Sequence, residues 1–322
     1  MATVHKTKPG FSSPRRPVYQ QSSQLAVLKG LFAGSMGGIA QVCVGMPFDT
    51  VKVRMQNNCS ISPLYKGYLH CISSILYKEG PLAFYKGALS PFTGISFCVS
   101  LQFGGFELMK RVVMHQHTKQ GRENPQILSK PEIIACGSVA GVFNSMASTP
   151  VEHIRIRMQQ QKNKKGEKGK FSGSYDAVTR IYRKYGFSGV MKGYCSALCR
   201  DSIAYGVYFG TYSTLKSKII GDQPNPSILK ILLCGALTGE VFWITVYPID
   251  LCKTKIQSDP FRGGKFTGLI PTAKEIYRLE GFKGFYRGYI TCVCRTPFSS
   301  GFTFVTVETV MKLIGPLGAT LE

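Results

Sequence analysis

The chain is short of acidic residues. Of its 322 residues, 40 are lysine or arginine and 17 are aspartate or glutamate, which gives a net charge of +23, and the first acidic residue is Asp49. A basic excess of this size fits an anionic partner, either nucleic acid or a membrane surface. The chain also lacks the interleaved basic and aromatic residues that stack single-stranded bases. A basic nucleic-acid-binding protein therefore remains only as an alternative.

Motifs of catalysis and of metal binding are missing as well. The eleven cysteines have no metal-ligand spacing, and several stand inside apolar stretches. That pattern favours reduced cysteines that pack in the interior over a disulfide framework. We find no nucleophile–base set and no glycine-rich loop that could cradle a phosphate. We therefore expect no enzyme activity, no metal and no cofactor.

What the chain does have is a ten-residue motif that occurs three times, about a hundred residues apart. It reads proline, any residue, acid, two residues, base, any residue, base, any residue, glutamine, at 47–56, 150–159 and 248–257. Glycines stand 13 and 9 residues before each proline, an aromatic-x-Gly follows the motif, and a Lys/Arg-Gly comes twenty residues later. Such self-similarity indicates tandem modules. We expect one domain of three repeats, at 24–115, 130–220 and 227–316.

Each repeat contains two apolar segments. A membrane-spanning helix needs about 20 residues, and backbone groups in lipid must be satisfied within the helix. We therefore expect an all-α membrane protein with six transmembrane helices and both termini on one side. A large soluble helical protein is the alternative, but six such segments would leave it too little polar surface. The paired segments are 25–47 and 88–106, 131–150 and 193–212, and 228–248 and 289–307.

The loops between paired segments are basic. Loops 57–87, 158–193 and 258–288 together carry 18 basic and 6 acidic residues, an excess of +12. This charge suits loops that face an anionic membrane surface. Residues 1–23 form a basic leader, in which three prolines argue against an amphipathic targeting helix. We expect this leader to be disordered.

These landmarks resemble the mitochondrial carrier family, the solute carrier 25 type, over residues 24–316. The tripled Pro-x-Asp/Glu-x-x-Lys/Arg motif, the aromatic-x-Gly and the Lys/Arg-Gly carry the resemblance. Residues 45–54 and 243–250 are similar to the carnitine/acylcarnitine and basic amino-acid carriers, and 144–157 to the fungal Ymc-type carriers. The resemblance implies six helices around a threefold axis with a short matrix helix in each repeat. It also implies termini in the intermembrane space and solute exchange across the mitochondrial inner membrane.

The motif predicts a gate at the matrix end. Its acid and first base stand three residues apart on each helix, so they can pair with neighbouring helices in cyclic order. The prolines remove a backbone hydrogen bond and kink the helices inward. Surface ion pairs worth about 0–1 kcal/mol each are the alternative, but charges repeated at membrane depth favour function. The predicted pairs are Asp49–Arg155, Glu152–Lys253 and Asp250–Lys52, and the resemblance implies amide braces at Gln56, Gln159 and Gln257.

A second, weaker gate is expected at the cytoplasmic end. There the family has an aromatic residue, an acid, two residues and a base, and only the first repeat, at 106–110, matches fully. The second repeat has Ser213 in place of the acid, and the third has Met311 in place of the base. We therefore expect this end to close less tightly. The surviving cyclic pairs are Glu107–Lys216 and Glu308–Lys110.

A substrate site is expected near the middle of the second spans. Gly94, Arg200 and Arg295 each stand seven residues after a Lys/Arg-Gly glycine, followed by Ile95, Asp201 and Thr296. An arginine suits a carboxylate, Asp201 suits an ammonium group, and midplane charges mark transport pathways. The resemblance adds that arginine followed by an acid here is typical of amino-acid and carnitine carriers. A structural Arg200–Asp201 pair is the alternative, but adjacent helical residues do not face each other.

Residues of the first spans join this site. Trp243, the only tryptophan, could cover a cation, although packing in the core is equally favoured. Glu240 lies on the same helix face and could bind an ammonium group or a proton, or pair with one of the two arginines. Asn144 and Ser145 stand at the corresponding level of the second repeat and could bind substrate through hydrogen bonds.

We therefore expect an alternating-access exchanger of small carboxylate-bearing zwitterions or cations, above all amino acids. Carnitine and acylcarnitines are an alternative, because the space beside Gly94 could take an acyl chain, and a proton-leak channel is another. We expect a monomer with cardiolipin as its lipid partner, since helix N-termini offer backbone N–H groups to phosphate. In the second repeat, Tyr185-Gly186 replaces the acid-Gly of the family. The predicted lipid-binding glycines are Gly67, Gly87, Gly173, Gly193, Gly268 and Gly288.

Overall fold

The computed structural model describes residues 19–58, 63–122, 124, 126–161, 170–221, 227–261 and 263–313, and all regular structure within them is helical. The long helices are α1 (Tyr19–Gln56), α3 (Leu89–Lys119), α4 (Lys130–Gln160), α6 (Tyr194–Leu215), α7 (Ile228–Ser258) and α9 (Tyr289–Leu313). Shorter elements are α2 (Tyr68–Lys78), α5 (Ser174–Val190), α8 (Leu269–Gly284), η1 (Pro81–Tyr85) and η2 (Lys216–Ile220). By length and hydropathy together, none of the helices in this described part qualifies as a membrane span.

Helix α1 begins inside the segment that was expected to be a disordered leader. It starts at Tyr19, two residues after Pro17, so 19–23 are helical and this part of the prediction is wrong. Proline disfavours helical geometry in the residue before it, which accounts for a helix that starts after the last proline. Residues 1–18 lie outside the described part of the chain.

Glycine marks the start of the short helices and of the second long helix in each repeat. Gly67, Gly173 and Gly268 are the extended N-cap residues of α2, α5 and α8, as the aromatic-x-Gly landmark predicted. The Lys/Arg-Gly glycines precede α3, α6 and α9 and have positive φ, +80° for Gly193 and +89° for Gly288. A Cβ at Gly193 would lie 2.9 Å from Gln257 Cγ, and one at Gly288 would lie 3.3 Å from Gln56 Cγ. These glycines turn the chain tightly against the motif helix of the next repeat.

Three equivalent core clusters fix the short helices to the motif helices. Ile75 of α2 packs with Val51 of α1, and Ile181 of α5 packs with Ile154 of α4. Ile276 of α8 packs with Leu251 of α7 in the same way, and all of these side chains are buried. Burial of an isoleucine side chain contributes about 1.5–3 kcal/mol. The repeated contacts therefore hold the three motif segments at one level.

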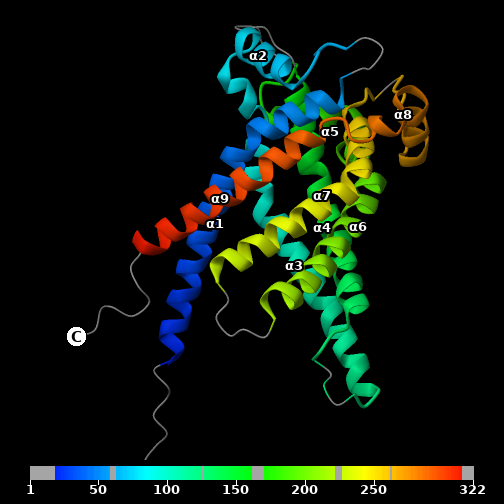
Figure 1. Cartoon of the computed structure of the whole chain (residues 1–322). Coiled ribbons are helices and arrows are strands. Elements are labelled where there is room, and N and C mark those ends of the chain that lie inside the picture. Colours follow the sequence, from blue (N-terminus) through cyan, green and yellow to red (C-terminus); the bar gives the residue numbers. More distant parts are fainter. Residues whose placement is uncertain are drawn as a thin grey trace, which may run out of the picture.

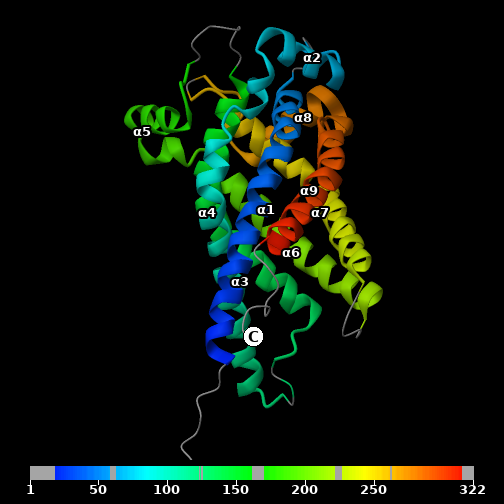
Figure 2. The same ribbon diagram turned by 90° about the vertical axis from the view of Figure 1, so that its left-hand side faces the viewer.

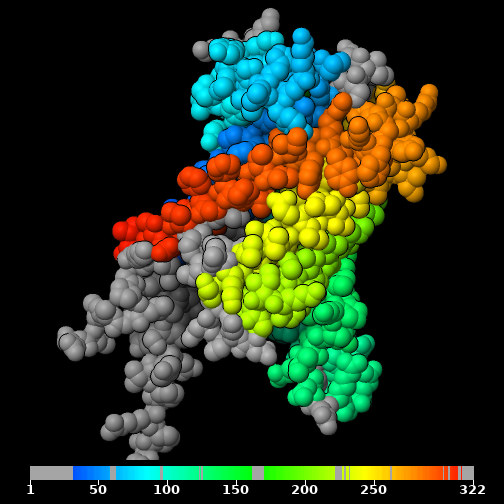
Figure 3. All heavy atoms as spheres, in the orientation of Figure 1, coloured from blue at the N-terminus to red at the C-terminus, as the bar shows by residue number. Residues whose placement is uncertain are grey.

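The long helices form two groups. α3, α4, α6 and α7 pack in chain order, and α9 packs along α1, whereas α1 touches α3 and α7 touches α9 only locally. Figures 1 and 2 show both groups meeting at the end that carries α2, α5 and α8 and separating toward the other end. We call the end that carries α2, α5 and α8 the closed end. Figure 3 shows α2, α8 and α9 covering it on the face turned to the viewer.

The glycine pairs thirteen and nine residues before the motif prolines behave differently in the three repeats. A Cβ at Gly137 would lie 2.6 Å from the Tyr205 carbonyl oxygen, so α4 and α6 approach closely there. Gly34, Gly38 and Gly235 have nothing within 4 Å of such a Cβ, and Gly239 has only an ordinary contact. Glycines four residues apart predict that neighbouring helices pack closely, and this prediction is wrong for the first and third repeats. Their two long helices barely touch in this conformation.

Candidate functional site

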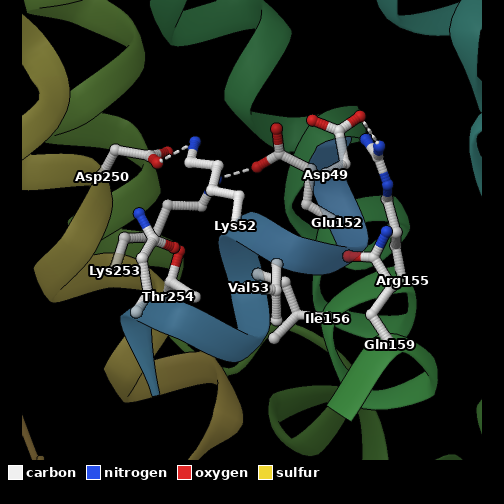
Figure 4. A pocket seen from close by; sticks show the side chains of 11 residues that line it. Asp49, Lys52, Val53, Glu152, Arg155, Ile156, Gln159, Asp250, Lys253 and Thr254 are labelled. Atoms are coloured by element: carbon white, nitrogen blue, oxygen red, sulfur yellow. Dashed lines mark hydrogen bonds and ion pairs between the residues drawn. The ribbon is translucent and has the colours of Figure 1, made fainter. Parts of the chain in front are cut away.

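The three motif segments converge on a small central pocket at the closed end. Lys52 Nζ lies 2.6 Å from Asp250 Oδ2, and ion pairs also join Arg155 to Asp49 and Lys253 to Glu152. These are the three pairs that cyclic pairing of the repeats predicts, and each joins two different repeats. Figure 4 shows them around a cavity of about 60 Å³. We call these six residues the ion-pair ring.

The motif glutamines stand beside the ring and are fully or almost fully buried. Gln56 and Gln159 line the central pocket. The Gln257 amide instead donates to the Lys192 carbonyl oxygen at 3.4 Å, which links α7 to the turn between α5 and α6. Bracing of the ion pairs by the amides stays a prediction.

Trp243 covers a cation of the protein itself. The Lys52 ammonium lies 4.3 Å from the centroid of the Trp243 ring and 5.3 Å from that of Tyr247. A cation over an aromatic face gains about 0.5–2 kcal/mol, the larger values in desolvated sites. Lys52 is buried, so α7 holds this ammonium group both through Asp250 and through the indole.

The two arginines expected to bind substrate reach the ring from α6 and α9. Nη2 of Arg200 lies 2.7 Å from both carboxylate oxygens of Glu152, and its Nε lies 3.9 Å from Asp250. Nε of Arg295 lies 3.3 Å from Asp49. Each ring carboxylate is thus close to a guanidinium as well as to its ring base. The sequence placed these arginines at one level but gave no sign that they touch the ring.

Gly45 makes room for the guanidinium of Arg295. A Cβ at Gly45 of α1 would lie 2.8 Å from Arg295 Nε and 3.3 Å from Ser299 Oγ. A larger residue there would displace the guanidinium from Asp49. Sequence reasoning missed this role, although a glycine two residues before the motif proline was a visible signal.

Asp201 lies in the interface of α4 and α6. Its side chain is fully buried and accepts hydrogen bonds from Asn144 Nδ2 and Ser148 Oγ, both at 2.9 Å. Its Oδ1 also lies 2.8 Å from Arg200 Nε. This contact corrects the expectation that adjacent residues would stay apart, because the long arginine side chain folds back to its neighbour. Ser148 was missed, although it stands four residues after Asn144 and so shares its helix face.

The remaining predicted site residues have other surroundings. A Cβ at Gly94 would overlap Val151 of α4, so the open space expected there is filled. Ile95 lies in α3, but its side chain falls outside the described part of the structure. Glu240 is half-buried and interacts with Tyr289 of α9. The Ser145 hydroxyl is buried and donates to the Val142 carbonyl oxygen of its own helix, at 2.7 Å.

The opposite end has looser ion pairs. Glu107 lies 3.7 Å from Lys110 and 3.6 Å from Arg111, both on its own helix, and its side chain is about half exposed. The predicted partner Lys216 stands at the start of η2 and has no ion pair with Glu107 in the described chain. Glu308 stands in α9. Its pairing with Lys110 stays a prediction.

A second tier of charges stands beside the ring and was not assigned a role from the sequence. The second base of each motif is Arg54, Arg157 or Lys255. Arg54 makes two hydrogen bonds to Glu79, at 2.5 and 3.0 Å, and Glu79 also accepts one from Lys86 at 2.6 Å. Burial alone would raise the pKa of Glu79, but these two bases hold it below its ordinary value. The sequence did contain a signal for these charges: an acid followed by glycine, Glu79-Gly80 or Glu280-Gly281, ends the short helix in two of the repeats.

Three surface pockets lie where a short helix and a long helix of neighbouring repeats begin. Ser90 and Ser174 line the first, and Tyr68 and Thr291 line the second; each has a volume of about 280 Å³. Gly193 and Leu269 line the third, whose volume is about 550 Å³. The N–H group of Gly288 donates to the Tyr68 hydroxyl at 3.2 Å. The arrangement repeats around the closed end with the same period as the motif.

The comparisons with known proteins agree with one another and cover most of the chain. A family model for "Mitochondrial carrier protein" matches residues 23–117, 128–223 and 224–317. The chain is 36% identical to the "Glutamate/glycine mitochondrial carrier ymc1" of Schizosaccharomyces pombe over 304 residues, 92% of this chain and 98% of that protein. It is 36% identical to the human "Mitochondrial basic amino acids transporter" over 282 residues, covering 87% and 88%. It is 32% identical to the human "Mitochondrial carnitine/acylcarnitine carrier protein" over 302 residues, covering 91% and 97%.

Proposed function

Because the chain belongs to the mitochondrial carrier family, we propose that it exchanges small amino acids across the mitochondrial inner membrane by alternating access. The observation that carries this proposal is the position of Arg200 and Arg295, whose guanidinium groups touch the carboxylates of the ion-pair ring. With them, five bases face four acids, the three of the ring and Asp201, which lies 2.8 Å from Arg200. This local excess of positive charge suits a substrate carboxylate.

The six long helices are the membrane spans in this proposal. Their even number puts both termini on one side. We take that side to be the intermembrane space, which puts α2, α5 and α8 on the matrix side. The structure then corresponds to a state that is closed toward the matrix by the ion-pair ring. Charged residues at such depth are costly unless they pair or line a water-filled path, and the ring satisfies that condition.

Substrate binding and gate opening compete for the same guanidinium groups. A substrate carboxylate that engages Arg200 takes it from Glu152, and one that engages Arg295 takes it from Asp49. The ring acids then keep fewer partners, and the closed state loses stability relative to the open one. A ligand shifts a conformational equilibrium only by its difference in affinity for the two states. Competition for the arginines supplies that difference.

The amino group of the substrate needs an acceptor near the same level. Asp201 is fully buried and already accepts two hydrogen bonds, so we assign it to holding α6 and Arg200 in place. Glu240 is half-buried, interacts with the Tyr289 hydroxyl and stands three residues from Trp243. Glu240 and the Trp243 ring form the amine side of the proposed site.

The proposal is tested by exchange measurements in liposomes loaded with glycine, glutamate or arginine. Replacing Arg200→Gln or Arg295→Gln removes a charge-assisted hydrogen bond worth about 1.5–3 kcal/mol, so uptake should fall roughly 10- to 150-fold. The matched control is Arg278→Gln on α8, whose side chain is 81% exposed. The control should exchange at the rate of the unaltered protein.

Two results would contradict the proposal. One is full uptake by both arginine variants while the protein remains folded. The other is uptake that needs no solute inside the liposomes, which would indicate a channel rather than an exchanger. An equal loss of uptake in the Arg278→Gln control would show that removing a positive charge anywhere lowers uptake, and that Arg200 and Arg295 have no special role.

Carnitine esters are the second candidate substrates, supported by the 32% identity to a carnitine/acylcarnitine carrier and by the Trp243 ring. The position of Val151 against Gly94 disfavours a long acyl chain at that point. Competition separates the two candidates: amino acids should inhibit exchange, and long-chain acylcarnitines should not. Inhibition only by acylcarnitines would reverse the assignment.

We further propose that cardiolipin binds the three pockets at the helix starts and that the carrier acts as a monomer. The first amides of a helix lack intrahelical acceptors and favour phosphate. Two such helix starts face each pocket, which suits a lipid with two phosphates. Added cardiolipin should raise the unfolding temperature of the detergent-purified protein more than a neutral lipid does.

A further inference from the structure

The second tier of charges is complete in only two of the three repeats. In the first, Glu79 bridges Arg54 and Lys86. In the third, Glu280 lies 3.7 Å from Lys255 and 3.2 Å from Arg287. In the second repeat, Tyr185 stands where the acid would be. The equivalent bases of that repeat are Arg157 and Lys192.

Arg157 and Lys192 donate hydrogen bonds to backbone carbonyl groups and form no ion pair in the described chain. Arg157 donates to the carbonyl oxygens of Ser258 at 3.1 Å and Asp259 at 2.5 Å. Lys192 donates to the carbonyl oxygens of Asp259 at 2.6 Å and Pro260 at 3.1 Å. Their charged groups lie 4.7 and 4.9 Å from the centroid of one ring, that of Phe261, and burial together with the Arg157 charge lowers the pKa of Lys192 to about 8. Two cations thus share a site in which neither forms an ion pair, and the Asp259 carboxylate acts on both only from beyond ion-pair distance.

A cavity of about 480 Å³ opens beside Arg157, between α5, the end of α4 and Phe261. Three more bases line it, Lys170, Arg180 and Lys184. Only Arg180 has a carboxylate partner among the described residues, Asp176 at 2.6 Å. Tyr185 and Phe261, stacked with centroids 4.0 Å apart, form an aromatic wall. Figure 2 shows α5 projecting from the side of the closed end, and the cavity shares no lining residue with the central pocket of the ion-pair ring.

We propose that this cavity binds an anion that carries two or more phosphate charges, in the place of the missing carboxylate. Arg157 and Lys184 contact the phosphate oxygens, and Lys170 and Arg180 add to the positive field. Charge-assisted hydrogen bonds from several bases are how proteins hold phosphate. The source is either a soluble phosphate compound of the matrix or the head group of a phospholipid, since both present the same oxygens. The site is independent of the proposed substrate path.

The experiment uses the full-length purified carrier and its unfolding temperature, followed with a thiol-reactive dye. Sodium pyrophosphate should raise this temperature by several degrees more than sodium chloride of equal ionic strength. Tyr185→Glu supplies the missing acid, so it should raise the unfolding temperature without ligand and abolish the pyrophosphate response. The double variant Lys170→Gln/Lys184→Gln should need at least tenfold more pyrophosphate, whereas Arg278→Gln on the exposed face of α8 should respond as the unaltered protein does.

A second arm distinguishes the two sources. If the anion is a lipid head group, cardiolipin in place of pyrophosphate stabilises the carrier, and the lysine double variant loses part of that effect. If the anion is soluble, only pyrophosphate shows the dependence on these lysines. The proposal is overturned if neither compound stabilises the protein beyond the salt control, or if Tyr185→Glu responds like the unaltered protein. Amino-acid exchange by the Lys170→Gln/Lys184→Gln variant, measured in parallel, keeps this outcome separate from failure of the transport proposal.

Discussion

Trp243 shows how one side chain can link the ion-pair ring to the substrate path. Its ring lies 4.3 Å from the Lys52 ammonium, which also pairs with Asp250. Trp243→Leu removes an interaction of about 0.5–2 kcal/mol, so the closed state should weaken and unpaired efflux of substrate should rise roughly 2- to 30-fold. Efflux from preloaded liposomes without external substrate measures this.

The conservative variant Trp243→Phe is the control. It keeps an aromatic face over Lys52 and should leak much less than the leucine variant. If Trp243→Leu leaks no more than the unaltered protein, while Lys52→Gln does leak, then the indole contributes nothing to the closed state and only packs in the interface.

Asp201 marks the limit of residue-level reasoning from the sequence. Its position next to Arg200 was evident, and its role in binding substrate stays a prediction. What the sequence could not give is the side-chain direction, since Asn144 and Ser148 lie more than fifty residues away in the chain. The same holds for Arg200 and Arg295, whose contacts with Glu152 and Asp49 depend on how far α6 and α9 tilt toward the ring.

At the scale of the helices, equivalent positions in the repeats give unequal packing. Gly38 and Gly141 both stand nine residues before a motif proline. A Cβ at Gly141 would overlap the backbone carbonyl group of Asp201, which cannot move aside as a side chain could. A Cβ at Gly38 would have nothing within 4 Å. Gly141→Ala should therefore destabilise the protein by about 1–3 kcal/mol through overpacking.

The matched variant Gly38→Ala should have the opposite sign, because alanine favours a helix over glycine by about 0.5–1 kcal/mol. Unfolding temperatures of the two variants in the same detergent give the comparison. Equal destabilisation by both would mean that α1 and α3 pack as tightly as α4 and α6, contrary to the two-group arrangement of the helices.

The helix boundaries were the most predictable part of the fold. Gly67, Gly173 and Gly268 precede the short helices because an extended N-cap and the buried isoleucines that follow are local features of the sequence. The three ring pairs were also predictable, since the repeat fixes their common level. Which long helices pack against one another could not be predicted, because that depends on how each repeat is oriented relative to the other two. The open spacing of α1 from α3 is the clearest case.

At the scale of the whole molecule, the two ends differ in the strength of their ion pairs. The ring at the closed end joins all three repeats, with its bases Lys52 and Lys253 buried. At the other end Glu107 pairs within its own helix, and the second repeat supplies Ser213 instead of an acid. In the orientation proposed above, we therefore expect the balance to favour the state closed toward the matrix when no substrate is bound.

This balance can be shifted by completing the third cytoplasmic pair. The double variant Ser213→Glu/Met311→Lys adds the acid and the base that cyclic pairing requires at those positions. The new ion pair should contribute about 0.5–1 kcal/mol. It should therefore move the conformational equilibrium roughly two- to fivefold toward the state closed on the cytoplasmic side. Apparent affinity scales with the fraction of protein in the competent state. The KM for substrate offered on the cytoplasmic side should therefore rise, and the KM from the matrix side should fall. The single variant Ser213→Glu lacks the new base and serves as the control. A rise in the KM of the double variant from both sides would mean damage to the substrate site rather than a shift between the two states.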